Sequence, residues 1–388
     1  LNDVYAAAMA GVYKQFPAHP DVAALYAESM MNRTAWQLWD IKLAKPAAGS
    51  DTARIIEVLE RAMADHGERH PGLLHLYVHT MEMSPTPERA LNAADRLRGL
   101  VPDSGHLQHM PTHIDVLCGH YGVAVEWNSR AIEADRKYVE RQGPLNFYSL
   151  YRCHDYHFKV YGAMFLGQFE CAMETTHEMV ESLPEELLRV ESPPMADWLE
   201  AFVPTEFHVL IRFGKWEEIL AKPFPADARL FAFTTVSQHY ARAVALAALG
   251  DVAKAKAEAK AFEKAAAKVP ESRKLMNNFC KDILGVAREM MLGEIAYREG
   301  NFDAAFTHLR RSVELDDSLP YDEPWGWMQP TRHALGALLL EQNQVEEAAS
   351  VYRADLGLDS TLPRACQHPD NVWSLHGYYE CLHRLGRR

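Results

Sequence analysis

The sequence predicts an all-α protein, an α-solenoid of stacked antiparallel helix pairs. A glycine turn recurs along the chain at intervals of roughly 36 to 50 residues, the range expected of helical-hairpin repeats. Apolar residues with helical spacing flank each turn, and no segment shows the sustained two-residue alternation of a half-buried strand. The turns are centred on Gly119, Gly167, Gly214, Gly250 and Gly300; Asn343 continues the series and Gly386 closes it.

Each turn carries residues suited to a helical hairpin. Glycine permits the left-handed backbone that ends a first helix. Alanine four or five residues later, as at Ala304 and Ala305 after Gly300, lets the second helix approach the first closely. The regular repeats therefore occupy residues 105–388.

Residues 1–104 form an N-terminal helical part of the same continuous domain, which spans 1–388. We expect the following elements in order: helices over 3–14 and 21–39, a Pro/Ala/Gly/Ser loop over 44–51, a helix over 52–64 capped by Asp51, a helix opened by Pro71, and its partner over 88–100.

Composition excludes several classes of function. The formal charge of −13 disfavours nucleic acid as a partner, because nucleic-acid binding needs a basic face. No apolar run reaches the ~18 residues that would span a membrane. The six cysteines are scattered without a C-x2-C pair, which indicates reduced thiols and a cytoplasmic protein. The chain opens at Leu1 rather than Met, which leaves open a leader or an upstream segment with further ligands.

Three short runs concentrate histidines. The first contains His75, His79 and Glu82; the second contains His106, His109 and His113; the third contains His154, Asp155 and His157. Within each run the spacing of three, four or seven residues puts the side chains on one helical face. Pro111 allows two arrangements of the second run. Either it opens a helix and leaves His106 and His109 on the approaching loop, or it kinks a helix that starts near Gly105.

The runs predict a metal-binding cavity. Neutral imidazole binds zinc, copper, iron and nickel, and two histidines one turn apart form a preorganised chelate. A cluster with almost no thiolate and few carboxylates favours copper or iron over magnesium or calcium, and zinc is possible. The site holds one ion with further histidines behind the ligands, or two ions with about three histidines each. Glu82, Asp115 and Asp155 can orient ligand imidazoles.

The alternative for each run alone is a set of satisfied core or groove histidines. Three runs in successive repeats favour the metal, because equivalent helices of a solenoid lie side by side on one wall. The segment 321–327 likewise allows a functional and a structural interpretation. Its functional interpretation is a substrate rim, or Glu323 as an acid or base within reach of the metal; its structural interpretation is a capping turn before a helix, with buried tryptophans.

The runs and the turns together resemble a group of tetratricopeptide-repeat-like proteins of bacteria and fungi. The motifs, in order, are His75-x3-His79-x2-Glu82, Pro85-x-Pro87-Glu88, Gly105-His106-Leu107-x-His109-Met110-Pro111-x-His113-Ile114, His154-x2-His157-Phe158, Tyr321-Asp322-Glu323-Pro324 and Trp373-Ser374-Leu375-His376-Gly377. The resemblance implies a superhelix of stacked helix pairs. It implies no particular activity.

Three functions follow as hypotheses. The first is a metal-dependent oxidoreductase, an oxygenase or oxidase of a small organic substrate, with metal held by His75, His79, His106, His109, His113, His154 and His157. The second is a zinc hydrolase with Glu82 or Glu323 as general base. The third is a scaffold without enzymatic activity that binds a peptide or protein partner in its groove.

Overall fold

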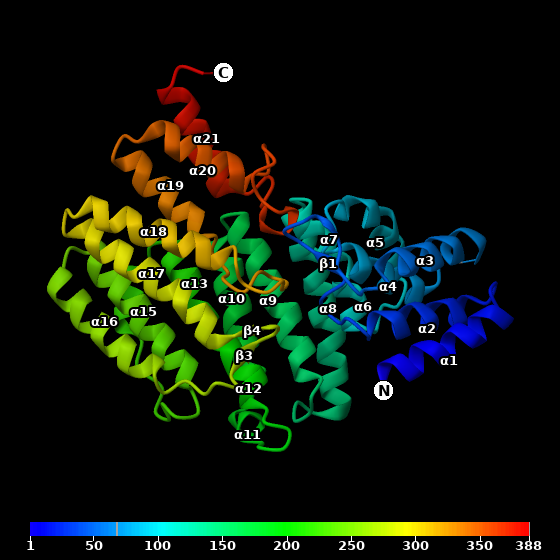
Figure 1. The fold of residues 1–388 in the computed structure, drawn as a ribbon. Helices are drawn as coiled ribbons and strands as arrows, with labels where there is room; N and C mark the ends of the chain where they lie inside the picture. Colours follow the sequence, from blue (N-terminus) through cyan, green and yellow to red (C-terminus); the bar gives the residue numbers. More distant parts are fainter. Residues whose placement is uncertain (67–68, 388) are drawn as a thin grey trace. The chain divides into compact units, whose positions relative to one another are not determined.

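The computed structural model describes residues 1–66 and 69–387 and divides the chain into two compact units (Figure 1). Unit 1 comprises Leu1–Tyr138 and Ala354–Asn371; unit 2 comprises Val139–Arg353 and Val372–Arg388. Both units are built from helices that pack in sequential pairs, so the predicted all-α, solenoid-like class is confirmed. The single continuous domain expected over 1–388 stays a prediction.

Unit 1 contains the expected N-terminal helices and the first repeat. Its elements are α1 (Asn2–Gln15), α2 (Pro20–Met31), β1 (Trp39–Asp40), β2 (Lys45–Pro46), α3 (Thr52–His66), α4 (Pro71–Met81), η1 (Pro87–Ala90), α5 (Leu91–Leu97), α6 (Gly105–His109), α7 (Pro111–Leu117), most of α8 (Tyr121–Gln142) and η3 (Arg364–Cys366).

Two predicted boundaries in unit 1 are wrong. The helix expected over 21–39 ends at Met31, and the chain continues as a loop into the β1–β2 hairpin. The carbonyl of Leu38 accepts hydrogen bonds from the Ala47 amide and the Thr52 hydroxyl, which hold this segment in the hairpin instead of a helix. The helix expected over 88–100 ends at Leu97, because Arg98 leaves the helical region (ψ 124°) and Gly99 is left-handed (φ +67°).

One face of α4 packs into the core of unit 1. Leu73, Leu74, Val78 and Met81 line one face of this helix and are fully buried. They pack with apolar residues of α2, α3 and α5, including Ile55 of α3. Because this apolar face points into the core, it fixes the direction in which the remaining side chains of α4 point.

Unit 2 contains the remaining helix pairs. Its elements are α9 (Ser149–Phe165), α10 (Phe169–Glu181), α11 (Glu185–Leu188), α12 (Ala196–Leu199), η2 (Glu200–Phe202), α13 (Thr205–Arg212), α14 (Trp216–Ala221), α15 (Ala232–Ala248), α16 (Val252–Ala266), β3 (Lys274–Leu275), β4 (Asn278–Phe279), α17 (Cys280–Arg298), α18 (Phe302–Asp316), α19 (Thr331–Glu341), most of α20 (Val345–Asp355) and α21 (Val372–Arg384). Its C-terminal core cluster includes Phe306, Leu309 and Leu339.

The turns follow the predicted chemistry. All six predicted turn glycines and Asn343 adopt positive φ, between +58° at Asn343 and +86° at Gly250. Five residues after each turn that leads into a second helix stands a fully buried small or apolar side chain. These residues are Ala124, Ala172, Ile219, Ala255, Ala305 and Ala348.

Regular structure other than helix is slight. In the described parts of the chain, four two-residue strands form two antiparallel pairs. This small amount of strand agrees with the sequence, which lacks sustained two-residue alternation. In residues 1–66 and 69–387, no helix combines the length and the apolar character needed to cross a bilayer.

Candidate metal centre

Helix α4 presents the first histidine pair. Pro71 occupies its first turn, and the ring of His70 caps it by accepting the Leu73 amide. His75 and His79 lie one turn apart on the face opposite the buried apolar residues. Glu82 follows the last helical residue and keeps a helical backbone (φ −56°, ψ −38°), so its side chain continues the same face.

Pro111 interrupts the second run without separating its histidines. Helix α6 starts at Gly105 and carries His106 and His109; α7 starts at Pro111 and carries His113. Met110 between them is helical, and its amide bonds the His106 carbonyl. The observed arrangement combines the two that the sequence allowed: Pro111 opens α7, as in the first, and a helix that starts at Gly105 carries His106 and His109, as in the second.

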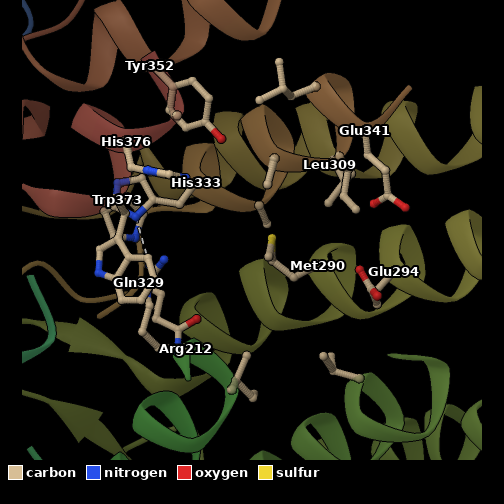
Figure 2. A pocket seen from close by; sticks show the side chains of 18 of the residues that line it. Arg212, Met290, Glu294, Leu309, Gln329, His333, Glu341, Tyr352, Trp373 and His376 are labelled. Carbon is tan, nitrogen blue, oxygen red and sulfur yellow. Dashed lines mark hydrogen bonds between the residues drawn. The ribbon is translucent and has the colours of Figure 1, made fainter. Parts of the chain in front are cut away.

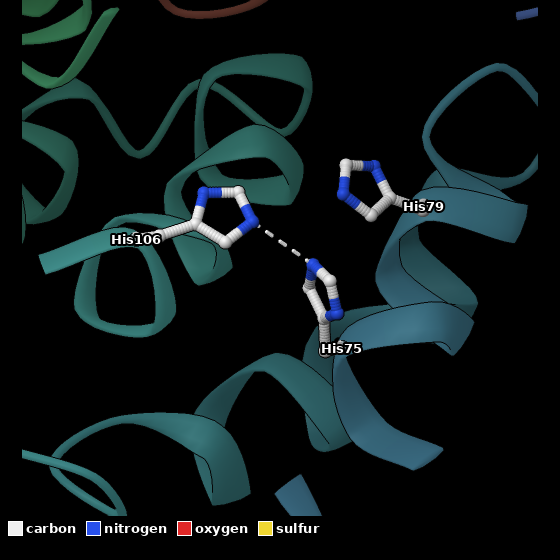
Figure 3. Close-up of side chains that lie close together, drawn as sticks. All are labelled: His75, His79 and His106. Carbon is white, nitrogen blue, oxygen red and sulfur yellow. Dashed lines mark hydrogen bonds between the residues drawn. The ribbon is translucent and has the colours of Figure 1, made fainter. Parts of the chain in front are cut away.

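Five imidazoles form one contiguous group, the histidine cluster: His75, His79, His106, His109 and His113. Neighbouring ring centroids are 4.7 to 6.3 Å apart. One set of possible ligand atoms within 4.8 Å of one another comes from His75, His79 and His106 (Figure 3). Two nitrogens bound to one ion at ~2.0 Å lie roughly 3 Å apart, and Nε2 of His75 is 3.1 Å from Nε2 of His106.

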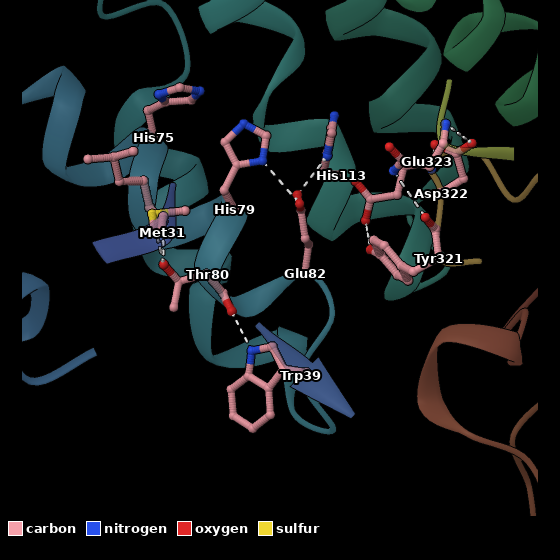
Figure 4. A network of polar contacts seen from close by, with 12 residues as sticks. Met31, Trp39, His75, His79, Thr80, Glu82, His113, Tyr321, Asp322 and Glu323 are labelled. Atoms are coloured by element: carbon pink, nitrogen blue, oxygen red, sulfur yellow. Dashed lines mark hydrogen bonds and ion pairs between the residues drawn. The ribbon is translucent and has the colours of Figure 1, made fainter. Parts of the chain in front are cut away.

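Glu82 connects the two runs. One carboxylate oxygen lies 3.0 Å from Nδ1 of His79, and the other lies 2.8 Å from Nδ1 of His113 (Figure 4). Because an ionised carboxylate only accepts, both rings must carry their proton on Nδ1. Each ring is then oriented with Nε2 as a lone-pair donor, the arrangement that carboxylates commonly impose on metal-binding histidines.

Asn128 fixes His109 in the same way. Its amide nitrogen donates to the Thr112 hydroxyl and the Ala124 carbonyl, so its oxygen faces Nδ1 of His109 at 2.7 Å. Nδ1 of His109 must therefore be the donor. Asn128 is fully buried on α8 and was not predicted. The sequence feature that could have identified Asn128 is its helical spacing: this polar residue shares one face of the helix with Tyr121, Ala124 and Ala131.

Two of the oriented rings meet directly. Nε2 of His109 is 2.7 Å from Nε2 of His113. With both protons on Nδ1, these two nitrogens would present lone pairs to each other, which is repulsive. Either a shared proton or a bound cation relieves the repulsion. Burial opposes the proton, because it lowers the pKa of His113 although Glu82 acts in the opposite direction.

The cluster is electrostatically suited to neutral ligands. Burial lowers the pKa of His106 to about 3, and the neighbouring His79 and His113 lower it further. The pKa of His75 is lowered well below its usual value by the same causes, burial first. Both rings therefore stay neutral near pH 7, as metal binding requires. A second possible donor set in unit 1 consists of His79, Glu82 and His113.

Asp115, another acid near these runs, has a different partner. Both of its oxygens accept hydrogen bonds from Arg98 at 2.7 Å. Burial raises the pKa of Asp115, and Arg98 counteracts that rise. The carboxylate forms a buried ion pair with Arg98, so the prediction that Asp115 orients a ligand imidazole is wrong.

The third predicted run lies on α9 in unit 2. His154, Asp155 and His157 are all buried. The His154 ring contacts Phe158, and the His157 ring contacts Phe202. Burial lowers the pKa of His157 to about 3, with a smaller effect from His208. Neither ring nitrogen of His157 has a hydrogen-bond partner among the described residues. The assignment of these three residues to the metal site stays a prediction.

Glu323 lies in the loop before α19 in unit 2. It is buried and accepts the hydroxyl of Tyr321. The adjacent Asp322 accepts Asn278 Nδ2 at 2.9 Å, and burial raises its pKa well above the usual value. Trp325 and Trp327 are buried, as the structural alternative requires. A role for Glu323 as acid or base stays a prediction.

Unit 2 also contains a cavity of about 610 Å³ (Figure 2). Arg212 lies at one end, where it donates to Nδ1 of His333 at 2.9 Å and stacks on Trp373. Glu294 lies at the other end, paired with Arg298 at 2.8 Å. Among the described residues of unit 2, no three ligating side chains converge as they do in the histidine cluster.

Comparison with known proteins adds no assignment. No protein-family profile matches the sequence, and no curated protein is significantly similar to it.

Proposed function

We propose that the protein is a copper-dependent oxidoreductase that acts on a small organic substrate. The observation that carries the proposal is the convergence of His75, His79 and His106, with Glu82 holding Nδ1 of His79. Three neutral nitrogen donors suit copper, which also forms the most stable complexes among divalent first-row metals. The two-histidine, one-carboxylate set of a non-haem iron oxygenase has a counterpart in His79, Glu82 and His113. Copper is favoured over iron because each oxygen of Glu82 already accepts an imidazole N–H, which suits this carboxylate to orienting ligands.

The protein and the metal have separate tasks. Copper supplies one-electron redox chemistry when it is bound. The chain orients the imidazoles through Glu82 and Asn128. It buries His109 and His113 and leaves His75, His79 and His106 partly exposed, so a small molecule can reach the proposed ligands. The tetratricopeptide-like family assignment is part of this proposal.

The zinc hydrolase alternative is less well supported. Its general base in unit 1 would be Glu82, but each oxygen of this carboxylate already accepts one imidazole N–H. Such a carboxylate is better placed to orient ligands than to take a proton from water. The peptide-binding scaffold needs no metal, so metal content distinguishes it from both enzymes.

Elemental analysis of protein expressed with copper, iron and zinc supplied together tests the proposal. We expect about one or two equivalents of copper, with nitrogen hyperfine structure in the electron paramagnetic resonance spectrum. The His75→Ala variant should lose most of it, whereas His120→Ala, which removes a half-exposed histidine of unit 1, should not. Less than about a tenth of an equivalent of any metal would favour the scaffold, and zinc alone would favour the hydrolase.

A further inference from the structure

A small pocket in unit 1 ends on the histidine cluster. Its volume is about 150 Å³, and His79 and Glu82 form part of its wall. Trp36, Leu38, Met31 and Met83 supply most of the rest. The pocket thus joins a ligand imidazole and the carboxylate that orients it to a mostly apolar lining.

Trp36 is held at this pocket by an unusual backbone. Its φ of +59° lies in the left-handed region, which is a genuine outlier for a bulky residue. The conformation brings the indole edge-on to His79, with ring centroids 6.1 Å apart. Strained backbone of this kind persists where the surroundings over-determine it, often at ligand sites.

The surrounding segment is anchored on α4. Trp39 donates its indole N–H to the Thr80 carbonyl at 2.7 Å, and the Thr80 hydroxyl contacts the sulfur of Met31 at 3.8 Å (Figure 4). The indole of Trp36 and the thioether of Met31 are therefore positioned by the same helix that carries His79. The pocket is a built feature of unit 1.

Size and lining define what fits. An apolar cavity of ~150 Å³ accommodates a molecule the size of benzene. The indole of Trp36 offers an aromatic surface, and the thioethers of Met31 and Met83 make favourable contacts with ring edges. Glu82 supplies the polar group. A carboxylate has about four lone-pair sites, and the hydrogen bonds of Glu82 with His79 and His113 leave acceptor capacity for one more donor.

We infer that this pocket binds the substrate, a single-ring aromatic molecule whose hydroxyl or amino group donates to Glu82. This inference rests on the proposed function, since it places the substrate beside the proposed copper ligands. Trp36 is its specificity-determining residue, because its ring closes the side of the pocket next to His79.

Phenol, toluene and 2-naphthol test the inference by titration calorimetry on the copper-loaded full chain. We expect phenol to bind at least tenfold more tightly than toluene, which lacks the donor, and than 2-naphthol, which exceeds the volume. Ala35→Trp fills the rim of the pocket and should weaken phenol binding at least tenfold with copper content unchanged. Ala48→Trp, at an exposed loop position outside the pocket, is the matched control.

Trp36→Ala provides a second variant. It should weaken phenol binding and shift the preference toward 2-naphthol by at least tenfold. Equal affinities for the three probes, or phenol binding unaffected by both pocket variants, would overturn the inference. Phenol binding to the metal-free protein is measured separately. Chains that bind phenol selectively but load no copper would refute the proposed function and leave the pocket assignment standing.

Discussion

The histidine cluster of unit 1 and the large cavity of unit 2 use polar side chains in opposite ways. In the cluster, Glu82 and Asn128 accept from Nδ1 atoms and so direct Nε2 lone pairs toward one another. In the cavity, the charged groups satisfy one another, as Arg298 does with Glu294. Volume alone would point to the cavity of about 610 Å³. The orientation of the donor atoms identifies the cluster as the candidate metal site, because a metal ion requires lone pairs directed at it more than it requires space.

Removing His79 should have the largest effect on copper affinity. His79 belongs to both possible donor sets of unit 1. We expect His79→Ala to lower copper affinity by at least about 100-fold, measured by competition with a chelator of known affinity. His333→Ala, which removes a histidine of the unit 2 cavity, should leave copper affinity unchanged. Equal losses in both variants would contradict the assignment of the metal to unit 1.

Changing Glu82 should have the next largest effect. Glu82→Gln replaces an acceptor-only group with one that presents an N–H₂ to one of the two rings. Copper affinity should fall about 10- to 100-fold, the usual cost of losing a partner that orients a metal-binding histidine. Glu341→Gln, at an exposed position lining the other cavity, is the control. Unchanged affinity in Glu82→Gln would mean that the carboxylate does not orient the ligands.

Acid should destabilise the metal-free protein through the cluster. The pKa of His106 is lowered to about 3, so the folded ring stays neutral where an unfolded histidine, with a pKa of about 6.5, takes a proton. The unfolded state then binds more protons, and stability falls as the pH drops below about 6.5. The contribution is up to about 1.4 kcal/mol per pH unit.

Thermal unfolding between pH 7.5 and 5 measures this dependence. His157 and His208 of unit 2 also have lowered pKa values, so the wild-type slope contains both units. His106→Leu isolates the contribution of the cluster. A wild-type slope that His106→Leu leaves unchanged would show that His106 is not kept neutral by burial.

The smallest effect is expected in unit 2. Arg212→Ala removes the stack on Trp373 and the hydrogen bond to His333. Stability should fall by about 1 kcal/mol, measured by denaturant unfolding, while copper content stays the same. A loss of copper in this variant would show that the two regions are not independent.

Much of the fold was predictable because it depends on local chemistry. Turn glycines such as Gly250 adopt the expected left-handed backbone, and Ala255 lies fully buried five residues later. The boundary at Met31 was not predictable. The apolar spacing after it continues, but Leu38 and Trp39 bond to residues far along the chain. Such contacts outweigh helix propensity, which is a weak preference.

The candidate site divides in the same way. Spacing along one helix already placed His75, His79 and Glu82 on a common face, since helical geometry fixes which side chains are neighbours. The meeting of His75 with His106, the sharing of Glu82 between His79 and His113, and the support from Asn128 depend on how separate helices pack. No local rule contains those distances, because they arise when apolar faces far apart in the chain are buried together.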